Sequence, residues 1–162
     1  MTTTHLSRRF AGALAILRVL IGWHFLYEGV VKVYNPDWTS FGYLASAQGP
    51  LESVFTSLAS ENVLPWVDTL NWLALVFVGI TLILGVLERP GALVGMGLLA
   101  MYYLAHPALP GLPQINAEGS YWLVNKNLIE LAACWLLFLQ PTGHIFGLAR
   151  VLIPSKTKTE LS

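Results

Sequence analysis

The residues from Phe10 to Val33 read FAGALAILRVLIGWHFLYEGVVKV, an apolar run long enough to cross a membrane. A transmembrane helix needs about 20 mainly apolar residues, and 17–25 is the usual range. The run nevertheless contains four ionisable residues, Arg18, His24, Glu28 and Lys32. Such residues cost roughly 2.5–3.5 kcal/mol each inside a span, so we expect them to have a partner or a function.

The composition of the whole chain agrees with this interpretation. Its 162 residues are 55% hydrophobic and 11% charged, whereas a typical soluble domain is about 25% charged. Nine Lys and Arg residues balance nine Asp and Glu residues, so the chain lacks the dense basic footprint of a nucleic-acid-binding protein. The single Cys134 excludes an internal disulfide and a cysteine-based zinc or iron–sulfur site. The sequence contains no recognisable motif for binding a metal, a flavin or a haem.

Four apolar stretches predict four membrane helices, at approximately residues 10–33, 66–87, 90–106 and 122–139. The fold class predicted is all-α, an integral membrane four-helix bundle that forms a single domain over residues 1–162. In the first outer loop, an apolar residue recurs at the spacing of one helical face: Leu51, Val54, Phe55 and Leu58. This spacing predicts a short amphipathic helix, either a binding surface or a lid packed on the bundle. We expect the tail, residues 155–162, to be disordered.

The basic residues predict the orientation. With four spans, one side of the membrane receives Arg8, Arg9, Arg89, Arg150, Lys156 and Lys158. Cytoplasmic loops carry the excess of Lys and Arg, so both termini should be cytoplasmic, in a bacterial inner membrane. The first stretch is too long and too charged for a cleaved signal peptide.

Two spans carry polar faces that should meet. His24, Glu28 and Lys32 recur every four residues on the first span, and Lys126, Asn127 and Glu130 share one side of the fourth. With the first span ending outside and the fourth beginning there, Glu28 and Glu130 should lie at similar depth. We therefore predict a polar pocket that opens toward the outer surface.

The pocket has two interpretations. In one, the ion pairs Glu28–Lys126 and Glu130–Lys32 only fix the register of the bundle. In the other, Glu28 and Glu130 are catalytic and pass protons, and other side chains bind a substrate or a quinone. The candidate binding residues are Arg18, His24, Lys32, Tyr103, His106, Lys126 and Asn127. Arg18 lies deeper than the rest, where it could instead be structural or reach the interface by snorkelling.

Several segments resemble the DoxX/DoxD-like membrane proteins. These are RVLIGWHFLYEGVVKV at residues 18–33, Phe41-Gly42-Tyr43-Leu44 followed by Gly49-Pro50, Tyr102–Pro107, Glu118–Tyr121 and Val124–Leu131. The resemblance covers about residues 10–140 and implies a four-helix bundle. Some relatives are the membrane subunit of thiosulfate:quinone oxidoreductase, and others are associated with thiol or oxidative-stress systems.

The resemblance implies a membrane subunit of a redox system, with a quinone as cofactor and a small sulfur compound such as thiosulfate as substrate. Its expected partners are membrane lipid and a second redox subunit, and no oligomeric state is predicted. The alternative is a non-catalytic scaffold or assembly factor that holds a partner through the outer loop.

Overall fold

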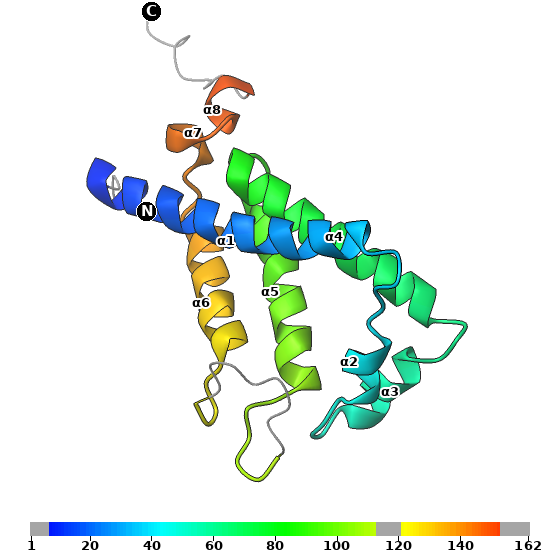
Figure 1. Ribbon diagram of the computed structural model, residues 1–162. Helices are drawn as coiled ribbons and strands as arrows, with labels where there is room; N and C mark the ends of the chain where they lie inside the picture. Colours follow the sequence, from blue (N-terminus) through cyan, green and yellow to red (C-terminus); the bar gives the residue numbers. More distant parts are fainter. Residues whose placement is uncertain (1–6, 113–120, 153–162) are drawn as a thin grey trace, which may run out of the picture.

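The computed structural model describes residues 7–112 and 121–152, and every regular element in these ranges is an α-helix (Figure 1). The four long helices are α1 (Arg8–Tyr34), α4 (Leu64–Leu84), α5 (Glu88–Ala105) and α6 (Lys126–Leu139). The four short helices are α2 (Phe41–Ala45), α3 (Glu52–Leu58), α7 (Gly143–Phe146) and α8 (Ala149–Leu152). The all-α prediction is confirmed for this part of the chain.

Within the described ranges, α1 and α4 are the helices long and apolar enough to cross a membrane. Only 33% and 28% of their best 18-residue stretches are buried inside the protein, whereas a core helix of a soluble protein is mostly buried. On α1 the large side chains of Ile16, Leu20 and Trp23 remain 65%, 63% and 61% exposed. A continuous exposed apolar surface of this kind is typical of a membrane-associated helix.

Glycines bring α1 and α4 into direct backbone contact. Gly22 and Gly29 lie on the face of α1 that meets α4, and Gly79 lies on the facing side of α4. A Cβ atom added at Gly79 would lie only 2.6 Å from the backbone nitrogen of Leu26. Small residues allow such close approach, which is the usual way that helices pack in membranes.

The four long helices pack on one another but are not all aligned. α5 and α6 run side by side, α4 packs against both α1 and α5, and α1 crosses α5 and α6 (Figure 1). Where they meet lies an apolar core of nine buried residues: Ile21, Phe25, Leu75, Val78, Leu82, Ala92, Leu99, Cys134 and Leu137. We refer to this set as the apolar core.

The short helices lie at opposite ends of the molecule. α2 and α3 lie beside the C-terminal end of α5, where the backbone N–H of Gln48 donates to the carbonyl of Ala105 at 2.8 Å. We call this the loop end. At the other end, α7 lies near the N-terminal end of α5, and the N–H of Leu148 donates to the carbonyl of Leu84 at 2.9 Å. We call this the latch end.

α3 confirms the predicted amphipathic helix and shows where its apolar face lies. Phe55 is 6% exposed and, with the partly buried Leu51 and Leu58, packs in a second cluster that contains Leu44 and Ala105. The apolar face is therefore used within the protein itself, as a lid. Val54 points elsewhere and is 52% exposed.

Helix boundaries differ from the predicted spans where backbone geometry intervenes. α4 begins two residues before the predicted second span and ends at Leu84, three residues before its predicted end, because Gly85 caps the helix with a left-handed φ of 68°. α6 begins at Lys126 instead of residue 122, because Tyr121 and Val124 pair through their backbones and Asn125 caps the helix by accepting from the N–H of Leu128. With 14 residues, α6 falls below the usual length of a span. α7 and α8 were not predicted, and the predicted tail lies outside the described residues.

Candidate functional site

An ion pair joins the two polar helix faces. His24 Nδ1 on α1 lies 2.7 Å from Glu130 Oε1 on α6, and the two side chains are 39% and 24% exposed. The second carboxylate oxygen, Glu130 Oε2, is buried and has no hydrogen-bond partner among the described residues. A buried carboxylate oxygen is costly when unpaired, so this atom marks a position where a water or a ligand group would be stabilised.

A second ion pair lies nearer the end of α1. Lys32 Nζ lies 2.7 Å from Glu28 Oε2, and it also lies 5.4 Å from the centroid of the Trp38 ring. Glu28 and Lys126 both act electrostatically on His24, so the two pairs form one group of interacting charges. We refer to His24, Glu28, Lys32, Lys126 and Glu130 as the polar cluster.

The pairing within the polar cluster differs from the predicted one. The sequence suggested Glu28–Lys126 and Glu130–Lys32, whereas the structure pairs Glu28 with Lys32 and Glu130 with His24. Lys32 is one turn from Glu28 on the same helix, and residues at this spacing are neighbours on the helix surface. Lys126 is consequently exposed, and no ion pair or hydrogen bond forms on its side chain within the described residues.

Three other predicted binding residues are placed as follows. Asn127 is half-buried beside Lys126 at the start of α6. The Tyr103 hydroxyl donates to the carbonyl of Leu123 at 2.9 Å, and His106 Nε2 lies 3.0 Å from the carbonyl oxygen of Tyr43. Tyr103 and His106 therefore hold segments of the loop end together through backbone carbonyls. Within the described residues, neither side chain forms a hydrogen bond with the two ion pairs of the polar cluster.

Tyr102 connects the loop end to the polar cluster, although it was not among the predicted site residues. The Tyr102 hydroxyl accepts from Asn71 Nδ2 at 2.7 Å. The carboxylate of Glu28 also acts electrostatically on this hydroxyl. Its carbonyl accepts from the Tyr43 hydroxyl at 3.0 Å. Burial raises the pKa of Tyr43, so that this hydroxyl remains a donor at neutral pH. The sequence signal that could have identified Tyr102 as a site residue was its position directly before the predicted Tyr103.

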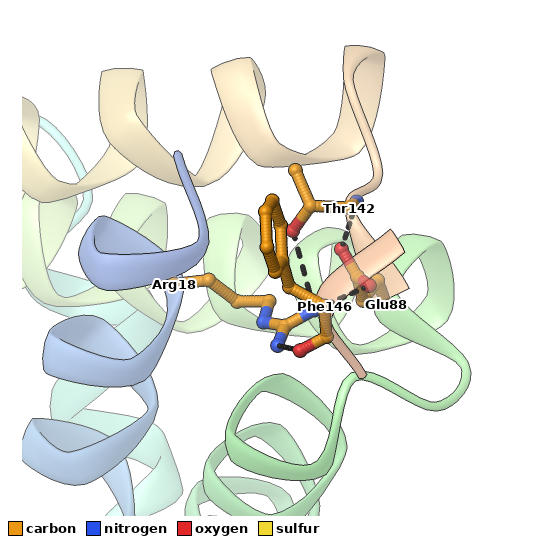
Figure 2. Close-up of polar contacts among 4 residues, drawn as sticks. All are labelled: Arg18, Glu88, Thr142 and Phe146. Atoms are coloured by element: carbon orange, nitrogen blue, oxygen red, sulfur yellow. Dashed lines mark hydrogen bonds and ion pairs between the residues drawn. The ribbon is translucent and has the colours of Figure 1, made fainter. Parts of the chain in front are cut away.

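Arg18 is buried at the latch end and does not face lipid. It is 1% exposed, and its Nη1 donates to Glu88 Oε1 at 2.8 Å and to Thr142 Oγ1 at 3.2 Å (Figure 2). Its Nη2 donates to the carbonyl of Phe146 at 3.1 Å, and the backbone N–H of Thr142 donates to Glu88 Oε2 at 2.9 Å. These four residues, which we call the Arg18 latch, connect α1, α5 and the segment that follows α6.

The latch corrects two interpretations made from the sequence. The snorkelling interpretation of Arg18 is wrong, because its guanidinium is paired inside the protein. Glu88, which the sequence places before the predicted third span at residues 90–106, is the first residue of α5, where a negative charge interacts favourably with the helix dipole. A deep arginine needs an acid at its own depth; this requirement was the signal that could have indicated Glu88, which was not predicted as a partner.

Comparison with known proteins identifies the family. The DoxX family model matches residues 13–107, more than half of the chain. The chain belongs to the DoxX family. No curated protein and no solved structure matches it. The DoxX match includes most of α1 and all of α2 to α5, with His24, Glu28 and the Arg18–Glu88 pair. It ends before α6, which carries Lys126 and Glu130.

Proposed function

We propose that this DoxX protein is an integral protein of the bacterial inner membrane, with both termini cytoplasmic. α1 and α4 are its main spans, and α5 and α6 complete a four-helix membrane bundle. The exposed apolar surface of α1 and α4 supports this arrangement. The distribution of charge supports it too, since Arg89 and Arg150 lie toward the latch end while Asp37, Glu52 and Glu61 lie toward the loop end.

We further propose that the protein is the membrane subunit of a redox system and binds a quinone at the polar cluster. The observation that carries this proposal is the His24–Glu130 pair, which is partly exposed between α1 and α6. The exposed side chains next to it, Leu20, Trp23 and Ile129, are apolar. A charged pair in such a place suits a ligand that combines an apolar tail with a polar head.

The residues of the polar cluster fit the needs of a quinone. A quinone supplies two-electron redox chemistry, and its two carbonyl oxygens require donors. His24, Lys126 and Asn127 offer donors at neighbouring positions of α1 and α6. Glu28 and Glu130 are the groups that hold and release protons, and the unpaired Glu130 Oε2 is available for this role.

A small anionic sulfur compound such as thiosulfate is the proposed substrate class. Lys126 supports this, because it is exposed and pairs with no acid in the described part of the chain. Lys32 supports it less, since Glu28 already neutralises it. Cys134 is the chain's single cysteine and is fully buried. A dithiol centre needs two cysteines, so we assign any such centre to a second redox subunit.

The proposal is tested by quinone binding to the purified protein in lipid nanodiscs. A short-chain quinone analogue should quench the tryptophan fluorescence of the wild type, because Trp23 is adjacent to His24. We expect His24→Gln and Glu130→Gln to bind roughly tenfold more weakly, a loss of about 1.4 kcal/mol. Glu61→Gln, at an exposed acid of the loop end, is the matched control. Equal affinity in all four proteins, or no binding by the wild type, would contradict the proposal.

The scaffold alternative loses its main support. It depended on an apolar face of the outer-loop helix that would be available to a partner. Phe55 and Leu58 on that face pack inside the protein's own second cluster. A partner that binds the loop end would have to use other residues.

A further inference from the structure

We infer that the polar cluster is reached by water and protons only from the loop end, and that the apolar core seals it from the latch end. The inference rests on the proposed insertion in a membrane. It adds a direction to the proposed site: any proton taken up or released there is exchanged with the outer side of the membrane.

The charged residues of α1 form a path toward the loop end. His24, Glu28 and Lys32 occupy successive turns, and their side chains are 39%, 47% and 15% exposed. With a rise of about 1.5 Å per residue, Glu28 lies about 9 Å and His24 about 15 Å before the end of α1 at Tyr34. Ionised groups at these positions need water or a partner, and the ladder places one such group on each turn of α1 from His24 to Lys32, near the helix end.

Beside His24, and from there toward the latch end as far as Arg18, the buried residues of the same helix are apolar. Ile21 is 6% exposed and Phe25 is 3% exposed, and they pack against Val78, Leu82 and Leu137, each of which is 0% exposed. Water inside such a layer would find no polar group to bind, and apolar cavities of this kind stay dry. The layer therefore separates His24 from the polar groups beyond it.

The Arg18 latch closes the far side of this layer. Arg18, Glu88 and Thr142 are 1%, 5% and 0% exposed, and they bond to one another through hydrogen bonds of 2.8–3.2 Å, while Arg18 Nε has no partner among the described residues. Both carboxylate oxygens of Glu88 accept within the latch. The latch is thus a closely packed polar contact on the far side of the apolar layer from His24.

Cysteine accessibility tests the inference without relying on any redox activity. In a Cys134→Ala background, the full-length protein is placed in right-side-out and inside-out vesicles and treated with a charged thiol reagent that does not cross membranes. The thiol introduced by His24→Cys should react from the loop side, about tenfold faster or more than from the latch side. The thiol introduced by Ile21→Cys, one turn deeper in the apolar core, should react from neither side.

Two exposed positions calibrate the sides. Glu61→Cys lies between α3 and α4, and His144→Cys lies in α7, so they should react from opposite sides. Asn127→Cys, at the start of α6, is the second probe should His24→Cys fail to fold. Reaction of the probe from the latch side, from both sides equally or from neither side would overturn the inference.

If the protein is not inserted in the membrane as proposed, the labelling gives a different result. Reaction of Glu61→Cys and His144→Cys from the same side would contradict the membrane arrangement, and the inference with it. A quinone that fails to bind would leave the sided labelling unchanged, since labelling depends on water access alone. The two proposals can therefore fail separately.

Discussion

Arg18 Nη1 lies 2.8 Å from Glu88 Oε1, and both side chains are more than 95% buried. The pair joins the middle of α1 to the first residue of α5, 70 positions apart in the chain. From the segment after α6, Thr142 bonds to both Arg18 and Glu88, and the carbonyl of Phe146 accepts from Arg18. One ion pair therefore holds three distant segments of the chain at the latch end.

Glu88→Gln should destabilise the protein strongly. Removal of the acid leaves the buried Arg18 guanidinium without its counter-charge, and loss of one partner of a buried pair costs about 3–5 kcal/mol. Thermal unfolding in detergent measures this as a lower midpoint temperature. The control is Arg89→Gln at the exposed neighbouring residue. The double variant Arg18→Met/Glu88→Gln should recover part of the loss, and equal stability of Glu88→Gln and Arg89→Gln would contradict the role of the pair.

Gly79→Ala should separate α1 from α4. The added Cβ would lie 2.6 Å from the backbone of Leu26, and forcing extra atoms into a packed contact costs about 1–3 kcal/mol. Gly97→Ala is the matched control, because it is also inside a long helix and its Cβ would meet nothing within 4 Å. That substitution should stabilise α5 by about 0.5–1 kcal/mol. Thermal midpoints that change in the same direction for both would contradict this packing.

Asp68→Ala should loosen α2 while leaving the long helices intact. Asp68 on α4 accepts from the backbone N–H of Ser40 at 2.9 Å and also from the Ser40 hydroxyl, just before α2 begins. Loss of these bonds should speed limited proteolysis around α2 with little change in the thermal midpoint. The control is Asp37→Ala, whose exposed side chain lies a few residues earlier. Identical cleavage rates for the two variants would show that Asp68 does not anchor the segment.

Reporter fusions should place the two ends of the molecule on opposite sides of the membrane. Alkaline phosphatase fused after Asn62, beyond α1 and α3, should be active, since the proposed orientation places the loop end in the periplasm. Green fluorescent protein fused after Arg150 should fluoresce, since the proposed orientation places α8 in the cytoplasm. The full-length protein should also stay in the membrane fraction after an alkaline wash. An inactive phosphatase together with a non-fluorescent fusion at Arg150 would invert the proposed orientation.

Much of the fold follows from short-range patterns. Apolar runs of membrane length predicted α1 and α4, and the spacing of Leu51, Phe55 and Leu58 predicted α3. The recurrence of His24, Glu28 and Lys32 every four residues predicted that one face of α1 is polar, and His24 does meet Glu130 of α6. These features depend on residues within a few turns of one another, so that helix periodicity alone describes them.

The boundaries of the helices were less predictable. The left-handed φ of Gly85 and Leu87 and the backbone pairing of Tyr121 with Val124 decide where α4, α5 and α6 begin or end. Each of these conformations depends on contacts made after the helices pack. Hydropathy averages over such positions and therefore misplaces them by several residues.

The sequence by itself determined the helical class, the apolar surface of α1 and α4 and the presence of charges where charges are costly. Only the tertiary structure decided which of those charges meet. Arg18 finds Glu88 across 70 residues, and Glu130 finds His24 instead of Lys32. Ion pairing depends on distances of a few ångströms, and these distances are set by how α1 crosses α5 and α6, to which every helix contact contributes.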